Sequence, residues 1–386
     1  MTNISITELK PGVKLSNHVH SPLGGLLLQK GKVLLPRDLD ILRAFMIEQV
    51  EIEDLQQLPE RKAAETVKEA SKEGYSASIA PSASIAPSAS IAPSASANGS
   101  AENETVSPYA ALHKEYDRML HLTKSAFQSV LAAELPIYEL RHQFEALIRH
   151  LKHYNVLTFT PQYMNEYDYL YHNALLSSLT SYQLAQWHGL PQKDWMQVAF
   201  AGLLHDIGNT KIDPVILYKP SPLTSDEAEE MRMHTTYGYQ QLRKTAAINE
   251  GVRLTALQHH EKMDGTGYPF RLTGDKIHIY AKIVSVADIF HAMTLNRRYR
   301  KAKSPYLVLE EIRSEAFGKL DPGVVQSFVD KVTQFHNGTR VRLSDGSVGE
   351  IVFSDRNHPT RPMVSVKGEI VNLVLTRELH IEEVLS

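Results

Sequence analysis

The sequence predicts a mainly α-helical protein with a small N-terminal α/β module and a small C-terminal antiparallel β appendix. Apolar residues recur at helical spacing through the middle of the chain, whereas its end contains short alternating runs separated by turn dipeptides. A low-complexity stretch separates the first module from the helical region. We therefore expect four parts: an α/β module at 1–58, a linker at 59–105, a helical domain at 106–335 and the β appendix at 336–386.

The N-terminal module is predicted from short apolar runs around one helical pattern. Runs at 25–28 and 33–35 flank a Lys-Gly-Lys turn at 30–32, which predicts a hairpin. Asp38 is expected to cap the helix that follows, and residues 50–52 are expected to form the last strand.

The linker has a repeated sequence that is unsuited to a folded core. Three tandem copies of Ser-Ala-Ser-Ile-Ala-Pro run from Ser76 to Pro93. A proline at every sixth position blocks both helix formation and sheet pairing, and the apolar residues are too sparse to build a core. We expect this segment to be a flexible or polyproline-like spacer.

The helical domain begins with two stretches of apolar residues at helical spacing, and prolines at 136 and 161 mark expected breaks. The residues that carry these two patterns are Leu112, Tyr116, Met119, Leu120, Leu122, Phe144, Leu147, Ile148 and Leu151. The β appendix is predicted from four runs, with hairpin turns at Asp345-Gly346 and Lys367-Gly368. These runs lie at 341–343, 348–353, 363–366 and 370–373.

Composition restricts the class of protein. The 386 residues carry a formal net charge of −3 with both signs spread along the chain, so we expect no binding to duplex nucleic acid. We find no apolar run long enough for a membrane span and no signal-peptide pattern, which favours a soluble, cytoplasmic protein. The chain has no cysteine, so a metal ion would have to be held by His, Asp or Glu.

Histidines and aspartates that suit a metal cluster occur in several separate segments. Adjacent histidines at 259 and 260 can each give a ring nitrogen to a different ion, and an aspartate can bridge two ions with its two oxygens. Asp288 lies in an apolar run, where a carboxylate needs a buried partner. Asp168 precedes His172 by one helical turn and would share its helix face. The candidate ligands are His172, His205, Asp206, His234, His259, His260 and Asp288, with Asp168 as a further candidate.

Each of these residues also has an ordinary explanation. His172 lies in an apolar helical stretch, where a lone histidine is more often a hydrogen-bonded core residue, and His234 could lie on a helix surface. The His-Asp dipeptide at 205–206 is common in proteins and is weak evidence alone. The order in which the segments follow one another is what favours a metal site.

That order resembles the HD-GYP domain over roughly residues 160–335. The His-Asp-Ile-Gly segment at 205–208 is similar to the HD motif that gives the superfamily its name, and the His-His-Glu segment at 259–261 with the Gly-Tyr-Pro at 267–269 is similar to the GYP motif. Further similar positions are His234, Gly238, Asp264, Gly265, Ala287, Asp288, Arg297, Arg300, Leu320, Asp321, Pro322 and Phe328.

The resemblance implies a metal-dependent phosphodiesterase of bacterial signal transduction that hydrolyses cyclic di-GMP to pGpG, GMP or both. It implies two or three divalent transition metal ions, iron or manganese, with His205 and Asp206 as the catalytic pair. The substrate-binding residues that it implies are Asn209, Gly267, Tyr268, Arg297 and Arg300. Family members often have a regulatory module before this domain, and they often pair as homodimers through the preceding helices, here about 106–155.

Three positions depart from the family pattern. Asn209 stands where the family usually has a phosphate-contacting lysine, Thr235 replaces a proline, and His291 replaces a second acidic residue. Two alternatives therefore stay open. The chain could be an HD-family phosphohydrolase that acts on another cyclic or linear nucleotide, or a receptor that binds cyclic di-GMP without hydrolysing it.

Overall fold

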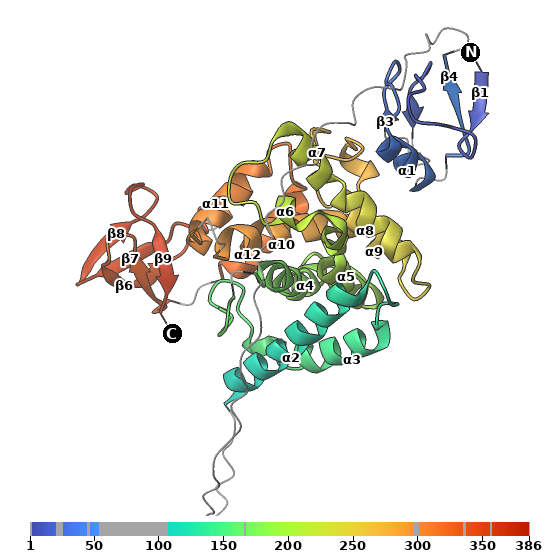
Figure 1. The fold of residues 1–386 in the computed structure, drawn as a ribbon. Helices are drawn as coiled ribbons and strands as arrows, with labels where there is room; N and C mark the ends of the chain where they lie inside the picture. Colours follow the sequence, from blue (N-terminus) through green and yellow to red (C-terminus); the bar gives the residue numbers. More distant parts are fainter. Residues whose placement is uncertain are drawn as a thin grey trace, which may run out of the picture. The chain divides into compact units, whose positions relative to one another are not determined.

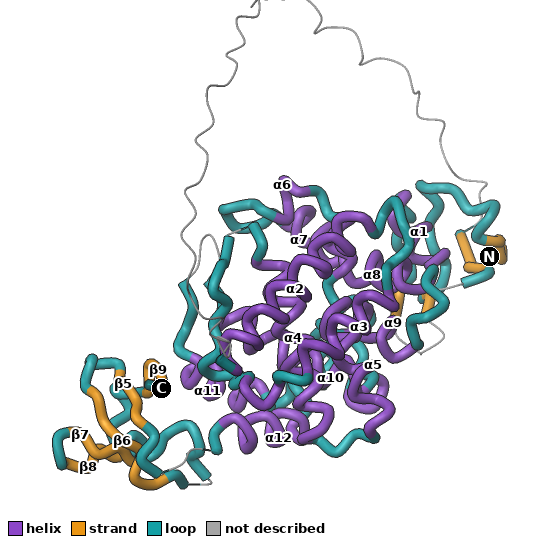
Figure 2. The backbone as a smooth tube through the Cα atoms, turned by 90° about the horizontal axis from the view of Figure 1, so that it is seen from below, coloured by secondary structure: helices purple, strands orange, loops and turns teal. Residues whose placement is uncertain are grey.

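The computed structural model describes residues 2–20, 26–44, 47–53, 107–165, 167–296, 301–334, 337–355 and 357–385 (Figure 1). The fold is mainly helical: helices occupy the middle of the chain, and strands occur in the described residues at its two ends (Figure 2). This confirms the predicted fold class. The predicted linker at 59–105 lies outside the described residues.

Eleven helices make up the described part of the helical domain. They are α2 (Pro108–Ser129), α3 (Ile137–Ile148), α4 (Tyr169–Trp187), α5 (Gln192–Leu204), α6 (Pro214–Leu217), α7 (Ser225–Arg232), α8 (His234–Arg243), α9 (Glu250–Gln258), α10 (Ile279–Thr294), α11 (Pro305–Glu315) and α12 (Pro322–Val332). Short 3₁₀ segments, η2 (Leu151–His153), η3 (Ile207–Lys211) and η4 (Gly274–Lys276), connect some of them.

The centre of this domain is α4, which packs against α5 and α10. Residues 172–181 of α4 are all buried, although several of them are polar. Serine and threonine side chains make this possible because they bond to neighbouring polar groups: the Ser178 hydroxyl donates to the Ala199 carbonyl of α5 at 2.7 Å. Gly202 of α5 also lies close to α4, because a Cβ there would be 2.9 Å from the Ser177 carbonyl oxygen.

The described residues of the N-terminal module form two strand pairs and one helix. Strand β1 (Thr2–Ser5) pairs antiparallel with β4 (Gln49–Ile52), and β2 (Val19–His20) pairs antiparallel with β3 (Leu26–Leu28). Helix α1 spans Pro36–Ala44. The strands predicted around 25–28 and 50–52 are present where the residues are described.

Two predictions for this module were wrong. The apolar run at 33–35 is not a strand, because helix α1 begins at Pro36 and leaves Val33 only an isolated bridge to Lys14. Asp38 is not the helix cap but a residue of the first turn. Its carboxylate accepts hydrogen bonds from the Leu35 backbone N–H and from the Lys32 ammonium, both at 2.8 Å.

The β appendix is a five-stranded antiparallel sheet with the order β8-β7-β6-β5-β9. The four predicted runs form β5 (Arg340–Leu343), β6 (Val348–Phe353), β7 (Met363–Val366) and β8 (Glu369–Asn372). The fifth strand, β9 (Ile381–Val384), was not predicted. Its Ile-Glu-Glu-Val sequence has charged residues at its centre and no alternation, so periodicity alone gives no signal.

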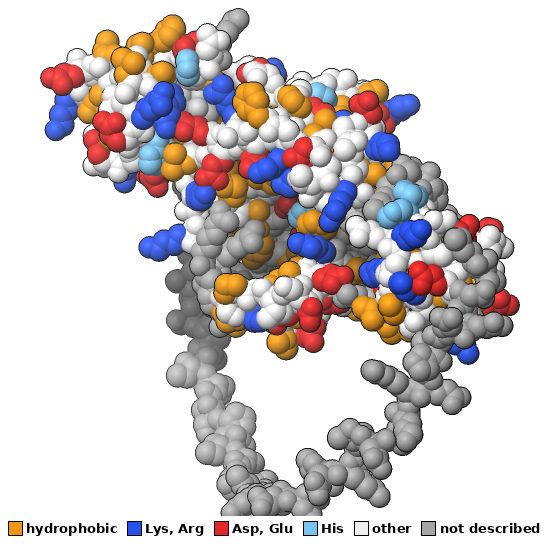
Figure 3. All heavy atoms as spheres, turned by 90° about the horizontal axis from the view of Figure 1, so that it is seen from above, with side chains coloured by type: hydrophobic (Ala, Val, Ile, Leu, Met, Phe, Trp, Pro, Cys, Tyr) orange, Lys and Arg blue, Asp and Glu red, His pale blue; other side chains and the backbone are white. Residues whose placement is uncertain are grey.

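Among the helices of the described residues, we find none with the combined length and apolar character of a membrane span. The described side chains on the face in Figure 3 carry charges of both signs in a mixed distribution. This agrees with the small net charge of the chain.

Candidate metal centre

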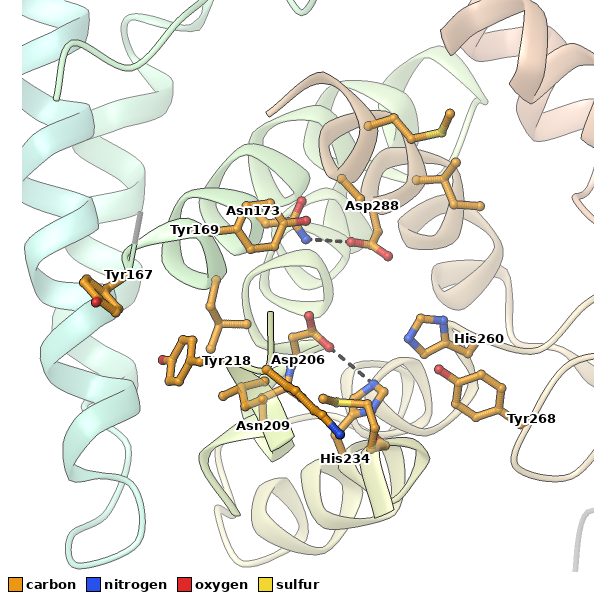
Figure 4. A pocket seen from close by; sticks show the side chains of 17 residues that line it. Tyr167, Tyr169, Asn173, Asp206, Asn209, Tyr218, His234, His260, Tyr268 and Asp288 are labelled. Carbon is orange, nitrogen blue, oxygen red and sulfur yellow. Dashed lines mark hydrogen bonds and ion pairs between the residues drawn. The ribbon is translucent and has the colours of Figure 1, made fainter. Parts of the chain in front are cut away.

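A pocket with a cavity volume of about 700 Å³ opens in the helical domain between α4, η3, α8, α10 and the loop after α9. Its lining has two chemically different ends (Figure 4). One end carries the imidazole and carboxylate groups of Asp206, His234, His260 and Asp288, which come from segments far apart in the sequence. The other end is rich in tyrosine.

Asp206 reaches the pocket because of a tight turn after α5. His205 ends that apolar helix, and η3 follows directly after Asp206. Gly208 in this turn packs so closely on the first residue of α8 that a Cβ there would collide with the His234 carbonyl oxygen. The glycine therefore brings the start of α8, and with it the His234 ring, next to the Asp206 carboxylate.

Asp206 lies at the centre of the cluster. Its Oδ1 is 3.4 Å from Nε2 of His234 and 3.6 Å from Nε2 of His259, and its Oδ2 is 3.5 Å from Nε2 of His205. Ligand atoms of Asp206, His234, His259 and His260 all lie within 4.8 Å of one another. His205 Nε2 is also 3.4 Å from Oδ1 of Asp288. Both oxygens of Asp206 thus face imidazole nitrogens, as a bridging carboxylate requires.

The histidine rings are held so that Nε2 faces the cluster. Nδ1 of His205 donates to the Gly202 carbonyl at 2.7 Å, and Nδ1 of His234 donates to the Met231 carbonyl at 2.6 Å. Nδ1 of His259 lies 3.1 Å and 3.2 Å from two carbonyl oxygens of its own helix. A hydrogen bond of this kind fixes the tautomer of a metal-binding histidine and leaves Nε2 with a lone pair.

This arrangement leaves nitrogen lone pairs facing one another. Nε2 of His234 is 3.3 Å from Nε2 of His259, and in neutral rings whose Nδ1 is the donor both of these nitrogens carry lone pairs. Nε2 of His205 is buried and has no hydrogen-bond partner in the part of the chain that the structure describes. Opposed acceptors are unfavourable unless a cation lies among them, so these residues fit a divalent metal ion.

The electrostatics of the cluster favour positive charge beside the carboxylates. Burial opposes protonation of His205, but the carboxylates of Asp206 and Asp288 outweigh it and raise the pKa of His205 to about 9. Burial lowers the pKa of His234 to about 4 and holds the pKa of His260 well below its ordinary value. The carboxylates therefore favour a positive charge beside Nε2 of His205, while the other two rings favour the neutral form, in which a ring nitrogen can ligate.

The loop after α9 carries the Gly-Tyr-Pro segment and is held by a buried carboxylate. The two oxygens of Glu261 accept the backbone N–H groups of Phe270 at 2.6 Å and Leu272 at 2.9 Å. Gly267 lies against the backbone of this segment, and a Cβ there would be 2.5 Å from the His260 carbonyl oxygen. The loop is consequently folded back on the histidine pair.

Tyr268 is placed by that loop beside the cluster. Its ring stacks on His260, with centroids 4.7 Å apart and planes inclined by 22°. The ring also lines the pocket, and the guanidinium of Arg232 lies 5.6 Å from its centroid. Tyr268 therefore both positions His260 and borders the space available to a ligand.

Asp288 is oriented by a residue that sequence reasoning missed. Asn173, on α4, donates from Nδ2 to Oδ1 of Asp288 on α10 at 2.6 Å (Figure 4). Nothing in the sequence pairs these two positions, because they meet only through the packing of α4 on α10. The sole indication was a polar residue in the otherwise apolar start of a helix, next to His172.

The two remaining predicted ligands, His172 and Asp168, have partners other than Asp206. His172 is buried, its Nδ1 lies 2.9 Å from the Tyr116 hydroxyl, and no described residue forms a hydrogen bond with its Nε2. Asp168 forms an ion pair with Lys124 of α2 at 2.6 Å. Neither residue belongs to the four-residue group around Asp206.

Of the predicted substrate-binding residues, Asn209 and Tyr268 line the pocket, and Gly267 shapes the loop that carries Tyr268. Arg297 and Arg300 lie outside the described residues. The tyrosines at the far end of the pocket were not predicted, although the Tyr-rich stretch at 167–171 could have indicated them.

Comparison with known proteins agrees with this geometry. Residues 156–324 match a family model described as an HD domain. The chain is 33% identical over 218 residues to a cyclic di-GMP phosphodiesterase of Pseudomonas aeruginosa, covering 56% of this chain and 52% of that protein. It is 39% identical over 190 residues to a cyclic di-GMP phosphodiesterase of Thermotoga maritima, covering 48% of this chain and 50% of that protein.

A third relative carries a different substrate in its name. The chain is 32% identical over 154 residues to 3′3′-cGAMP-specific phosphodiesterase 2 of Vibrio cholerae, covering 40% of this chain and 30% of that protein. The chain spans about half the length of the first two relatives and less of the third. Residues 156–324 are therefore similar to HD domains, and the same region holds the histidine–aspartate cluster and the Gly-Tyr-Pro loop.

Proposed function

We propose that this protein is a metal-dependent phosphodiesterase that hydrolyses cyclic di-GMP to pGpG, GMP or both. The observation that carries the proposal is the set of imidazole nitrogens that face one another around Asp206 at one end of a pocket. The pocket volume lies in the range of small-molecule sites. Two relatives whose names give this activity support the choice of substrate.

The metal-holding residues in this proposal are His205, Asp206, His234, His259, His260 and Asp288, with His172 and Asp168 as candidates for a further ion. A ligand set of imidazoles and carboxylates without sulfur suits iron or manganese. Two or three such ions, when bound, supply Lewis acidity and lower the pKa of a water molecule to near neutrality.

In the proposed reaction, the oxygen of water forms a bond to phosphorus while the bond from phosphorus to the ribose O3′ breaks, and the departing O3′ takes a proton. Asp206 orients the attacking water because its carboxylate lies at the centre of the cluster. Tyr268 borders the substrate, and Arg297 and Arg300 balance the negative charge that develops on the phosphate.

The test is an anaerobic assay with iron or manganese, read by chromatography for pGpG and GMP. We expect product from the wild-type protein, and loss of both metal and product in the double variant His205→Ala/Asp206→Ala. The exposed His358 of the β appendix provides a matched control, because His358→Ala removes an imidazole far from the cluster in sequence. Full activity in the double variant would show that the assignment is wrong.

A second substrate is favoured by one specific observation. Asn209 lines the pocket and is neutral, whereas a lysine at this position would add positive charge. In addition, one relative is named as specific for 3′3′-cGAMP. The same assay with 3′3′-cGAMP beside cyclic di-GMP distinguishes the two substrates by their kcat/KM ratio. Binding of cyclic di-GMP without product from either substrate would identify a receptor instead.

A further inference from the structure

The end of the pocket opposite the metal cluster is built from aromatic side chains. Tyr167, Tyr169 and Tyr218 lie there, away from His260 and Tyr268, as Figure 4 shows. Tyr167 lies just before α4, whereas Tyr218 directly follows the short helix α6. Two chain segments that are distant in sequence thus bring their rings to one wall.

The rings of Tyr167 and Tyr218 form an accessible pair. Their centroids are 6.3 Å apart and their planes meet at 73°. Tyr167 is 50% exposed and Tyr218 is 40% exposed, so a large part of each ring is open to a ligand. Exposed aromatic surface beside a pocket is unfavourable in water and becomes favourable when a flat apolar group covers it.

A polar side chain between the two ends has an unused hydrogen-bonding group. Asn209 is only 6% exposed, it lines the pocket, and its buried Oδ1 has no hydrogen-bond partner among the described residues. A buried amide oxygen of this kind costs free energy unless a ligand donates to it. The pocket therefore offers a hydrogen-bond acceptor between the metal cluster and the tyrosine wall.

Charge does not explain the tyrosine wall. Lys219 is the only lysine or arginine among the described lining residues, and Glu227 already holds it through two short contacts at 2.7 Å and 2.5 Å. A group that binds at this end must be recognised mainly through its flat face. Purine bases stack on aromatic side chains in this way without any need for charge.

We propose that Tyr167 and Tyr218 form a nucleobase subsite, in which a purine of the substrate packs on the tyrosine wall while its phosphate lies at the metal cluster. Asn209 accepts a hydrogen bond from the nucleoside between these two points. This assignment rests on the proposed function, because it takes the ligand to be a nucleotide. It adds residues that would bind the base of the nucleotide, whereas the metal cluster would bind its phosphate.

The test uses two ligands that differ only in the base: GMP and ribose 5-phosphate. Their dissociation constants are measured by calorimetry on the full-length, manganese-loaded protein, so no turnover is required. We expect GMP to bind at least about fivefold more tightly than ribose 5-phosphate, as stacking of one base on an aromatic ring would give. The double variant Tyr167→Ala/Tyr218→Ala should bring this ratio close to one.

Three further variants separate stacking from a general loss of structure. Tyr218→Phe keeps the ring and should retain the preference for GMP, whereas Tyr218→Leu fills the space without a π face and should reduce it. Tyr138, 77% exposed on α3, is a matched surface tyrosine, and Tyr138→Ala should leave the ratio unchanged. With cyclic di-GMP as substrate, loss of the wall should raise KM more than it lowers kcat.

The outcomes distinguish this inference from the proposed function. If the alanine and leucine variants keep the wild-type preference for GMP, the tyrosine wall is not a base subsite, whatever the enzyme hydrolyses. If the wild-type protein shows that preference and the variants lose it, but cyclic di-GMP is not hydrolysed, the subsite stands and the proposed reaction is wrong.

Discussion

At the scale of single residues, the candidate metal centre depends on the candidate ligands and also on the groups that form hydrogen bonds with them. Backbone carbonyls of Gly202 and Met231 set the tautomers of His205 and His234. The Asn173 amide orients Asp288 in the same manner. Such contacts determine where a lone pair points, and this decides whether a cluster of histidines can hold an ion.

Asn173 gives a prediction at this scale. Replacing it by leucine removes the 2.6 Å hydrogen bond to Asp288 and leaves that carboxylate free to turn away from the cluster. Loss of a contact of this kind lowers metal affinity by about 10- to 100-fold, and we expect Asn173→Leu to do so. Titration of the metal-free protein with manganese measures the change.

The conservative variant provides the control. Asn173→Gln keeps a side-chain amide and should recover part of the affinity, whereas a purely structural defect would affect both variants alike. Manganese affinity equal to that of the wild type in Asn173→Leu would show that Asp288 needs no such support.

The residues of this site could be predicted from the sequence to the extent that they lie in ordered motifs. Asp206, His234, His259 and His260 were all named, and the structure brings them within 4.8 Å of one another. The contact of Asn173 with Asp288 and that of Tyr167 with Tyr218 could not be predicted in this way, although polar and Tyr-rich positions near the start of α4 were visible in the sequence. Their roles arise only when helices distant in the sequence pack together, and no spacing rule describes that.

At the scale of elements, a few short segments determine how the helices present their side chains. The turn at 205–208 joins α5 to η3, and its close approach to α8 depends on Gly208. The loop after α9 is held in a similar way by Glu261. Both segments lie at helix ends, where backbone groups need partners from elsewhere.

Glu261 gives the prediction at this scale. Its replacement by alanine leaves the backbone N–H groups of Phe270 and Leu272 without acceptors, and both residues are buried. Each unpaired buried group costs about 1–3 kcal/mol, so we expect the free energy of unfolding to fall by roughly 2–6 kcal/mol. Urea unfolding of Glu261→Ala and the wild type measures this difference.

Glu261→Gln separates hydrogen bonding from charge. Its amide oxygen can still accept one of the two N–H groups, so it should lose less stability than the alanine variant. Burial raises the pKa of Glu261 to about 7, so the folded protein already tolerates a neutral side chain here. Equal stability of the wild type and Glu261→Ala would mean that the loop is held by other contacts.

Helix and strand boundaries agreed with the sequence predictions where a proline or a turn dipeptide marked them. The start of α3 after Pro136 and the turn at Lys367-Gly368, where both residues have positive φ, agree with the predictions. The run at 33–35 failed because Pro36 begins a helix directly after it. Strand β9 was missed because it is recognised only by its pairing with β5.

At the scale of the whole molecule, the metal centre connects elements that no continuous stretch of chain holds together. Its candidate ligands come from the end of α5, the start of α8, the end of α9 and the middle of α10. Ions bound there would cross-link four helices of the folded state and would have no comparable site in the unfolded chain. Binding of this kind stabilises the folded protein in proportion to the logarithm of ligand concentration over Kd.

Removal of the metal should therefore lower the thermal stability of the helical domain. Ions present at 100 to 1,000 times their Kd contribute about 2.7–4.1 kcal/mol, which corresponds to a fall in Tm of the order of 10 °C for a domain of this size. We expect this shift when the manganese-loaded protein is treated with a chelator, followed by calorimetry. The double variant His205→Ala/Asp206→Ala should show no shift with chelator, because it has no metal to lose. A chelator shift of the same size in the wild type and this variant would place the stabilising ion elsewhere in the molecule.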